Sequence, residues 1–268
     1  MDYKNHILID GGYFFFYRFH ATKLWFNKSH SEMQIDDLSE NEDFINMFIK
    51  RTSGTINELS KKFRCKTSEI IFASDCARSN IWRNTSNIID NYKGNRKKTV
   101  GIGKMIKIGY NILHEMKNPP KIINCSNAEA DDIIAVISKK INSDFPNDYV
   151  KIITSDKDLE QLCNEKTVIH HLKNKFPLAE CKYDPKISLM IKIIGGDKSD
   201  NIPPIAPKIG KKNIIELASS SELLNDYLKK SSDEVRNNYE TNNKMIDLSM
   251  IPHEIKENII DKYQYYTI

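Results

Sequence analysis

Acidic residues recur in this sequence in short clusters, several of which directly follow an apolar segment. One cluster, in IIGGDKSDNIPP (residues 193–204), places Asp197 and Asp200 shortly after two glycines. Such a pair by itself is typical of a helix cap or a solvated turn. Four further clusters accompany it, so nine carboxylates are candidates for one site: Asp10; Asp75; Glu129, Asp131 and Asp132; Asp156 and Asp158; and Asp197 with Asp200.

Carboxylates gathered in one place predict a site for divalent metal ions. Like charges repel strongly where the dielectric constant is low, so such a group needs either protons or cations. Mg²⁺ and Mn²⁺ prefer oxygen ligands, and two such ions about 4 Å apart can hold a phosphodiester during in-line displacement. The paired Cys and His ligands of a structural zinc site are absent from the sequence. We therefore expect two Mg²⁺ or Mn²⁺ ions bound by the nine acids.

The spacing within the clusters also has simpler structural explanations. If Glu129 and Asp132 are helical, they share a face, and Asp131 points elsewhere and orients water. Asp156 and Asp158 fall on the same side of an extended segment. Alternatively, Asp156 or Asp158 caps the following helix, and Glu129 is a first-turn acid favoured by the helix dipole. The five clusters together favour the metal site over these alternatives.

The elements that must position these acids alternate between strands and helices. Short apolar runs predict strands at 6–10 (HILID), 69–74 (EIIFAS), 121–124 and 149–154, and longer runs predict helices at 13–26, 43–63 and 128–141. This order indicates an α/β fold, a mostly parallel sheet flanked by helices. Ligands of such sheets bind beyond the carboxyl ends of the strands. Asp10, Asp75 and Asp156 lie there, so we expect the acids to converge.

The strand pattern stops at about residue 185, and short helices separated by Pro, Gly, Ser and Asn follow. We therefore expect two parts, an α/β domain over 1–185 and a helical domain over 186–268. The 268 residues suffice for one large domain or one domain with an appendage. The polar tract at 237–244 is expected on the surface.

The overall composition is that of a soluble globular protein with anionic partners. Of its residues 40% are hydrophobic and 28% are charged, and 40 basic against 36 acidic residues leave a net charge of +4. The five cysteines are scattered without a C-x-x-C pair. No stretch of about 18 uncharged apolar residues and no signal peptide are present. We expect a soluble, intracellular monomer with reduced cysteines and no membrane partner, in the cytoplasm or nucleus.

The motifs that carry the acids resemble those of the 5′-nuclease superfamily. The segments ILIDGG, FASD followed by IWR and YKGNR, AEADD, TSDKDLEQL and GGDKSDNIP occur in the order of that superfamily, which includes flap endonucleases and the 5′-exonuclease domains of bacterial DNA polymerases. The chain is most similar to the phage ribonuclease H branch. The resemblance implies a PIN-like α/β nuclease domain, a helical arch at about 93–117 and a carboxyl-terminal helix-three-turn-helix domain.

The resemblance also assigns roles to residues. It implies a first metal group of Asp10, Asp75, Glu129 and Asp131, and a second of Asp156, Asp158, Asp197 and Asp200. Asp132 matches the remaining acid of the AEADD motif. Lys93 and Arg96 match a basic pair directed at the scissile phosphate, with Arg83 nearby, and Tyr92 matches an aromatic ring that stacks on a terminal base. The further residues expected to bind nucleic acid are Lys97, Lys98, Lys104, Lys208, Gly210, Lys211 and Lys212.

The roles assigned to Tyr92 and to the basic residues after it have simpler alternatives. Without the acids, Lys93 and Arg96 to Lys98 would be read as a solvated loop, and Tyr92 as a core residue. The hairpin at 201–210 has Pro204 where the family usually has glycine. In the family this hairpin presents backbone amides and a potassium ion to a duplex phosphate, and proline lacks the amide donor, so K⁺ is only a candidate here.

The segment 97–110 is glycine-rich, with Gly101, Gly103 and Gly109, and is predicted to be a mobile gateway that becomes ordered on a threaded 5′ strand. Gly101 to Lys104 does not form a phosphate-binding P-loop, because the G-x-x-x-x-G-K-[ST] pattern and a preceding strand are missing. ATP hydrolysis is therefore not expected. His170 and His171 are interpreted as structural or surface residues.

The sequence thus predicts a metal-dependent, structure-specific 5′–3′ exonuclease and flap endonuclease. Its expected substrates are DNA with a 5′ flap or 5′ end, branched or nicked, and RNA paired with DNA, in primer removal during replication or repair. A single-strand-binding protein and a sliding clamp are candidate partners. One alternative is a catalytically silent scaffold that binds flap DNA. Another is a PIN-type ribonuclease acting on single-stranded RNA, which would have no use for the duplex-binding helices.

Overall fold

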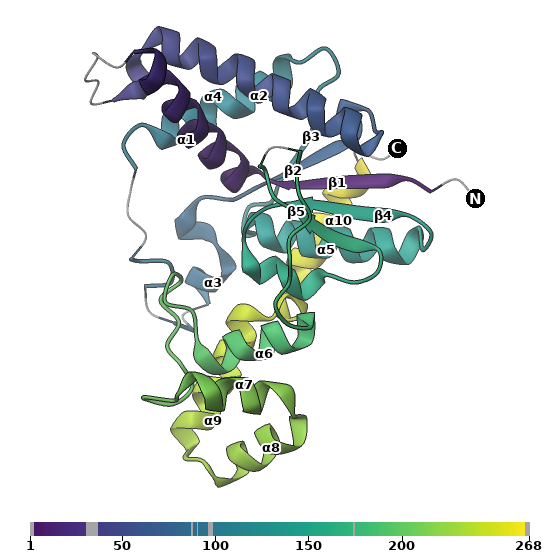
Figure 1. Cartoon of the computed structure of the whole chain (residues 1–268). Helices are drawn as coiled ribbons and strands as arrows, with labels where there is room; N and C mark the ends of the chain where they lie inside the picture. Colours follow the sequence, from purple (N-terminus) through teal and green to yellow (C-terminus); the bar gives the residue numbers. More distant parts are fainter. Residues whose placement is uncertain are drawn as a thin grey trace.

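The computed structural model describes residues 3–30, 37–86, 88–89, 91–95, 99–173 and 175–265. Its centre is a sheet of five parallel strands in the order β3-β2-β1-β4-β5 (Figure 1). The strands are β1 (Asn5–Asp10), β2 (Ile70–Ser74), β3 (Lys121–Asn124), β4 (Tyr149–Ile153) and β5 (Thr167–His170). The predicted parallel sheet is confirmed. The sequence missed β5, because its short TVIH run is too brief to stand out between polar residues.

One face of the sheet is covered by α1 (Gly11–Ser29), α2 (Glu42–Phe63) and α4 (Ile102–Glu115). Phenylalanine rings from α1, α2 and the sheet form the core beneath them. Phe14 and Phe15 on α1 both contact Phe72 on β2 through ring contacts, and all three side chains are fully buried. Burying an aromatic side chain stabilises the fold by about 1.5–3 kcal/mol. This face therefore anchors the start of α1 beside the end of β1.

The opposite face is covered by α5 (Ala130–Asp144) and α10 (His253–Tyr265). Ile133, Ile137 and Ile141 lie one or two turns apart on α5 and are all buried against the strands. Ile259 and Tyr263 of α10 belong to the same core. The last helix thus packs on the sheet domain, which differs from the single helical domain predicted for 186–268. Its apolar side chains complete the core on this face of the sheet.

A smaller helical lobe contains α6 (Pro185–Gly195), α7 (Lys211–Ser219), α8 (Ser221–Lys230) and α9 (Asp233–Ile246). Its core is formed around Ile194, Ile205 and Leu224. At Gly196 the chain turns out of α6 with φ +69°, and a Cβ there would lie 2.5 Å from the carbonyl carbon of Pro203. Glycine is required at this turn for both reasons. The turn delivers the following acids to the sheet domain.

Residues 102–115, which lie within the predicted helical arch, form α4. The mobile gateway predicted for 97–110 is wrong for the part that belongs to α4, because this helix is packed into the core. Met105, Gly109 and Ile112 recur at helical spacing and are buried, and Leu113 lies in the same core. The apolar stripe of this segment outweighs its glycines because it completes the phenylalanine core. The predicted phosphate contacts Arg96, Lys97 and Lys98 lie outside the described residues. Among the residues that are described, no helix is both long and apolar enough to cross a bilayer.

Gly109 permits the close approach of α4 to α1. A Cβ at this position would lie 2.4 Å from ring carbons of Phe15, whereas a Cβ at Gly103 on the same helix would meet nothing within 4 Å. We expect Gly109→Ala to lower the free energy of unfolding by about 1–3 kcal/mol. Gly103→Ala should instead raise it by about 0.4–1 kcal/mol. Urea unfolding of both variants measures this, and a stabilised Gly109→Ala would contradict the packing.

Candidate active site

The carboxyl ends of β1, β2 and β4 open into a cavity of about 720 Å³. The cavity contains most of the predicted metal ligands. Eight of the nine predicted carboxylates line it: Asp10, Asp75, Glu129, Asp131, Asp156, Asp158, Asp197 and Asp200. The side chains of Lys93 and Lys192 also line it. Acids that lie far apart in sequence therefore meet here, because parallel strands end at the same edge of the sheet.

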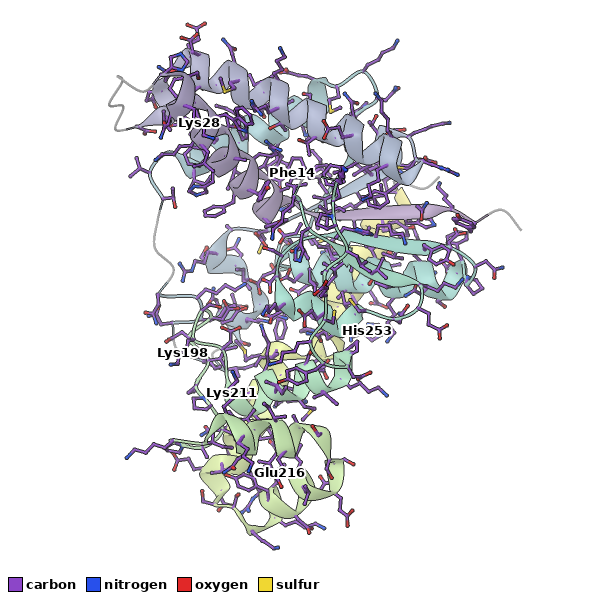
Figure 2. All side chains as sticks on the ribbon, viewed as in Figure 1. Phe14, Lys28, Lys198, Lys211, Glu216 and His253 are labelled. Carbon is purple, nitrogen blue, oxygen red and sulfur yellow. The ribbon has the colours of Figure 1, made fainter. Side chains whose placement is uncertain are left out.

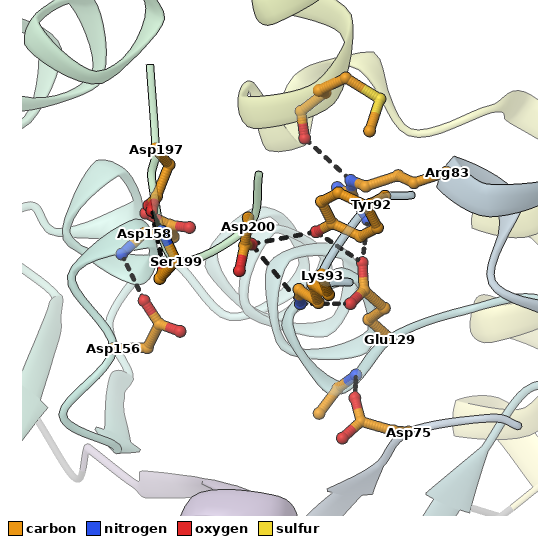
Figure 3. Close-up of polar contacts among 12 residues, drawn as sticks. Asp75, Arg83, Tyr92, Lys93, Glu129, Asp156, Asp158, Asp197, Ser199 and Asp200 are labelled. Atoms are coloured by element: carbon orange, nitrogen blue, oxygen red, sulfur yellow. Dashed lines mark hydrogen bonds and ion pairs between the residues drawn. The ribbon is translucent and has the colours of Figure 1, made fainter. Parts of the chain in front are cut away.

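Hydrogen bonds orient the acids that follow β1 and β2. Asp10 caps α1 by accepting a hydrogen bond from the Tyr13 amide at 3.0 Å, and it accepts another from the Thr154 hydroxyl at 3.1 Å. Asp75 accepts from the Ala130 amide at 2.8 Å, as Figure 3 shows. These contacts attach each carboxylate to a neighbouring element. The acids are held in the cavity by the same bonds that begin α1 and α5.

The acids at this edge raise one another's pKa values. Burial, followed by the charge of Asp75, raises the pKa of Asp10 to about 7. Burial and the charges of Asp156 and Asp10 raise the pKa of Asp131 well above its ordinary value. The carboxylate forms are therefore unstable in this arrangement unless cations neutralise them. Oxygen ligands in a strongly negative cavity fit hard divalent cations such as Mg²⁺ and Mn²⁺.

The AEADD motif is arranged differently from the prediction. Glu129 precedes α5 in an extended conformation, with φ −86° and ψ 162°, so helical spacing does not relate it to Asp132. Glu129 and Asp131 line the cavity, whereas the Asp132 side chain is fully buried elsewhere. Asp132 accepts hydrogen bonds from the Glu129 amide at 3.0 Å and from the Trp82 indole at 3.0 Å. The predicted metal-ligand role of Asp132 is therefore wrong, and its role is to shape the start of α5.

Arg83 is likewise buried, with 3% of its surface exposed, and does not reach the cavity as a phosphate ligand would. Its Nη1 donates to Glu129 Oε2 at 2.8 Å and to Asp132 Oδ1 at 2.9 Å. Its Nε donates to the carbonyl oxygen of Met245 on α9 at 2.8 Å (Figure 3). The predicted catalytic role of Arg83 is therefore corrected to a positioning role. It holds Glu129 and joins the sheet domain to the helical lobe.

Tyr92 is 4% exposed, which is incompatible with its predicted stacking on a base. Its hydroxyl lies 3.2 Å from Glu129 Oε2 and 3.2 Å from Asp200 Oδ2. The alternative, that Tyr92 is a core residue, is the one the structure shows. Two other aromatic side chains, Tyr13 and Phe16, line the cavity, and Phe16 is the more open of them, with 45% of its surface exposed. Phe16 could have been found from the sequence by its position in the predicted helix, nearly two turns after Asp10.

Lys93, for which a catalytic role was predicted, lines the cavity. Its ammonium group forms an ion pair with Glu129 and lies 3.7 Å from Asp200 Oδ2. Its backbone amide donates to the Asp200 carbonyl at 3.0 Å, and its φ is +57°. A non-glycine residue in the left-handed region is uncommon and costs free energy. The backbone contact with Asp200 thus holds Lys93 in a conformation that directs it to the acids.

Lys192, which sequence reasoning missed, neutralises acids on the other side of the cavity. Its Nζ lies 3.0 Å from Asp197 Oδ2 and forms an ion pair with Asp158. Burial opposes ionisation of Asp197, but hydrogen bonds from Ser199 and the charge of Lys192 lower its pKa overall. Among the described residues, no three acidic, His or Cys side chains converge on a preformed metal position. The carboxylates of Glu129, Asp158 and Asp197 pair with the lysine ammonium groups of Lys93 and Lys192.

The predicted nucleic-acid contacts of the hairpin lie outside the cavity. Lys208, Gly210, Lys211 and Lys212 are all exposed at the start of α7. Figure 2 shows Lys198 and Lys211 near the junction of the sheet domain and the helical lobe. Lys104 lies on α4 and pairs with Glu40 at 2.8 Å, away from the cavity lining. The structure thus brings the predicted contacts at 208–212 into one surface region, and Lys104 lies elsewhere.

Removing the charge of Arg83 should destabilise the fold more than removing that of Lys93. Without Arg83, the buried Asp132 loses its charged partner, and loss of one member of a buried pair costs about 3–5 kcal/mol. Without Lys93, Glu129 still pairs with Arg83. We therefore expect Arg83→Met to lower the free energy of unfolding by several kcal/mol, measured with urea. An effect no larger than that of Lys93→Met would disprove the positioning role.

Similarity to known families and proteins extends over much of the chain. The family described as "5'-3' exonuclease, N-terminal resolvase-like domain" matches residues 5–187. Ribonuclease H of Enterobacteria phage T4 is 28% identical over 224 residues, which cover 75% of this chain and 71% of that protein. A 5′-3′ exonuclease of Buchnera aphidicola (subsp. Baizongia pistaciae) is 32% identical over 185 residues, 63% of this chain and 60% of that protein. DNA polymerase I of Bacillus subtilis is 34% identical over 122 residues, only 13% of that protein.

Solved structures share the fold over the whole chain. The zinc-bound 5′-exonuclease of bacteriophage T5 has a TM-score of 0.67 at 19% identity and covers 98% of this chain and 100% of that one. The bacteriophage T5 flap endonuclease in a pseudo-enzyme-product complex with DNA and metal ions has a TM-score of 0.65 at 17% identity, with coverage of 99% and 100%. Because the family match spans most of the sheet domain and the acids of its motifs meet in one cavity, the chain belongs to the 5′-3′ exonuclease family of phosphodiester hydrolases.

Proposed function

We propose that the protein is a divalent-metal-dependent, structure-specific 5′–3′ exonuclease and flap endonuclease. It hydrolyses phosphodiesters of DNA and of RNA/DNA duplexes, in primer removal during replication or repair. The observation that carries this proposal is the convergence of eight carboxylates and Lys93 in one open cavity. A phosphodiester is anionic, so it enters such a cavity only when cations outweigh the acids.

The two groups of acids named above are proposed to hold two ions. The first consists of Asp10, Asp75, Glu129 and Asp131, and the second of Asp156, Asp158, Asp197 and Asp200. The shared cavity and the raised pKa values of Asp10 and Asp131 support this assignment. When bound, Mg²⁺ or Mn²⁺ supplies Lewis-acid polarisation of the phosphodiester oxygens. A potassium ion at the hairpin remains part of the proposal for duplex binding.

Lys93 is proposed to stabilise the negative charge that develops on the phosphate. Its ammonium group is already in the cavity, where Glu129 and Asp200 hold it in place. Because this charge is positioned in advance, the surroundings do not have to reorganise when negative charge develops during the reaction. Arg83 and Tyr92 in turn fix the Glu129 carboxylate from the buried side. The side chain of Phe16 offers an exposed apolar surface at the cavity edge for a base next to the cleaved bond.

The start of α7 is proposed to bind the duplex behind the cleavage site. Helix N-termini bind phosphate through free backbone amides, and Lys208, Lys211 and Lys212 add positive charge. Pro204 contributes no amide donor, so the contacts fall to the residues around Gly210. Single-strand-binding protein and a sliding clamp are proposed partners, and a monomer suffices for all these contacts.

Cleavage of a 5′-flap duplex tests the proposed function. The duplex is labelled at either end and incubated with Mg²⁺ or a chelator, and the protein is compared with Asp156→Asn and with Asp226→Asn on the exposed face of α8. We expect cuts near the flap junction that disappear with the chelator and fall by about 100-fold or more in Asp156→Asn, because a metal-binding carboxylate is lost.

The Asp226→Asn control should cleave like the unmodified protein. The two labels separate exonuclease from endonuclease products. Tight flap binding without any cleavage, by a protein with native circular dichroism, would overturn the nuclease proposal and support the silent scaffold instead.

Lys192 is expected to compete with a cation for Asp158 and Asp197, because its ammonium group pairs with both. Lys192→Met should therefore bind Mn²⁺ more tightly than the unmodified protein, by about 10-fold for one lost charge near the surface. Calorimetric titration with Mn²⁺ in the absence of DNA measures this directly. Lys192→Arg, which keeps the charge, should bind Mn²⁺ like the unmodified protein, and equal affinity of all three would refute the competition.

A further inference from the structure

A second cavity, of about 360 Å³, lies between α1, α2 and the turn that follows β5. We call it the basic groove. Its charged lining residues are four cations and one acid: Arg18, Arg51, Lys173, Lys175 and Glu58. None of the proposed catalytic residues lines it. A groove with this excess of positive charge favours a polyanion.

Arg18 at the base of the groove has hydrogen-bonding capacity to spare. Its Nη1 donates to the Thr55 hydroxyl at 3.0 Å, but its buried Nε has no hydrogen-bond partner among the described residues. Burial and the nearby Arg51 lower its pKa, so the surrounding protein groups only partly stabilise the positive charge of the guanidinium. An anion beside Arg18 and Arg51 would satisfy the donor and offset the repulsion between the two groups.

Trp25 provides an aromatic surface at the same groove. The ring is 56% exposed, although tryptophan is usually well buried. The guanidinium of Arg51 lies 4.8 Å from its centroid, and the Lys28 ammonium lies 5.7 Å from it. Figure 2 shows Lys28 at the end of α1 that is remote from the sheet. An exposed ring among cations is the arrangement that binds a base together with its phosphates.

Gly54 gives the groove an open floor. It lies in the middle of α2, where glycine costs about 0.5–1 kcal/mol relative to alanine. Its φ is not positive, and a Cβ would meet no atom within 4 Å. Neither backbone conformation nor packing inside the protein therefore accounts for the glycine. A ligand backbone that approaches α2 closely would account for it.

The turn after β5 supplies the remaining lysines and is held in a costly conformation. Lys175 has φ +63° and Phe176 has φ +46°, both in the left-handed region. The Lys62 ammonium donates to the carbonyl oxygens of both residues, at 2.9 Å for Phe176. This contact holds the turn against the groove, with Lys173 and Lys175 in its lining.

The basic groove adjoins the catalytic cavity through α1. Tyr13 lines the cavity and Tyr17 lines the groove, and their ring centroids are 6.0 Å apart. The Tyr13 hydroxyl also accepts a hydrogen bond at 3.2 Å from the amide of Leu172, another groove residue. A strand that leaves the cavity along this side of α1 reaches the groove directly.

We propose that the basic groove binds a single-stranded DNA segment continuous with the strand cleaved in the cavity. This inference rests on the proposed function, because it assumes that nucleic acid is the substrate. In the groove, the phosphates contact Arg18, Arg51 and Lys175, and one base stacks on Trp25. The open floor at Gly54 admits the sugar-phosphate backbone.

Binding of a fluorescein-labelled 12-nucleotide oligothymidine, followed by anisotropy in the presence of EDTA, tests the groove without cleavage. We expect Trp25→Ala, Arg51→Gln and Gly54→Leu each to weaken binding about 10-fold, as stacking and phosphate contacts of this kind do. Lys50→Gln removes one charge from the same helix but not from the groove lining, so it should stay within about 2-fold. Gly54→Leu should also raise the melting temperature, which excludes unfolding as the cause of weaker binding.

Tryptophan fluorescence reports directly on stacking. The chain has two tryptophans, and only Trp25 is exposed, since Trp82 is 7% accessible. The oligothymidine should quench the emission, inorganic polyphosphate should not, and Trp25→Phe should abolish the quenching. Unchanged emission together with unchanged affinity of Gly54→Leu would overturn the proposal.

The flap-cleavage assay separates the two proposals. If the protein cleaves but the groove variants bind the oligothymidine normally, the groove inference fails and the proposed function stands. If the groove variants weaken binding but no cleavage occurs with any metal, the proposed function fails and the groove stands as a binding site.

Discussion

Repulsion among carboxylates at one edge of a parallel sheet is the constraint on which the rest of this structure depends. The fold places eight acids around one cavity, and burial raises the pKa of Asp10 to about 7. Folding would oppose such an arrangement unless positive charge were built in beside it. Lys93 and Lys192 supply that charge from inside the cavity, and Arg83 supplies it from the core behind Glu129. A metal ion is thus expected to enter a site where ammonium groups already pair with the acids.

Two of the same residues, Arg83 and Lys93, also connect the two parts of the chain through hydrogen bonds to backbone carbonyls. Arg83 bonds to Glu129 at the start of α5 and to the Met245 carbonyl at the end of α9. The amide of Lys93 bonds to the carbonyl of Asp200 in the turn after α6. Acids from the helical lobe therefore reach the sheet edge through bonds made by residues of the sheet domain. The geometry of the cavity and the position of the helical lobe therefore depend on the same residues, Arg83 and Lys93.

The helical layer formed by α1, α2 and α4 has two distinct surfaces. Its inner surface is the phenylalanine core that fixes α1 beside β1 and thereby orients Asp10. Its outer surface carries the basic groove, where the buried Nε of Arg18 has no hydrogen-bond partner among the described residues and a Cβ at Gly54 would meet no atom within 4 Å. Because α1 contributes to both surfaces and to the cavity, a strand bound on its outer side would lie close to the reaction centre. Packing and the proposed substrate recognition would therefore constrain the same helix.

The sequence by itself determined the parallel sheet, the acids at its edge and the family, because apolar runs and acidic motifs are local patterns that survive without coordinates. It could not determine where buried side chains point. Asp132, Arg83 and Tyr92 carry the right chemistry for the cavity, but the extended backbone at Glu129 and the packing of α9 turn them into the core. Likewise, the helical patterns of α4 and α10 do not show where these helices pack. In the structure, α4 shares a core with α1, and α10 shares a core with α5. Lys192, Phe16 and the basic groove depend on contacts between distant segments, which tertiary structure alone creates.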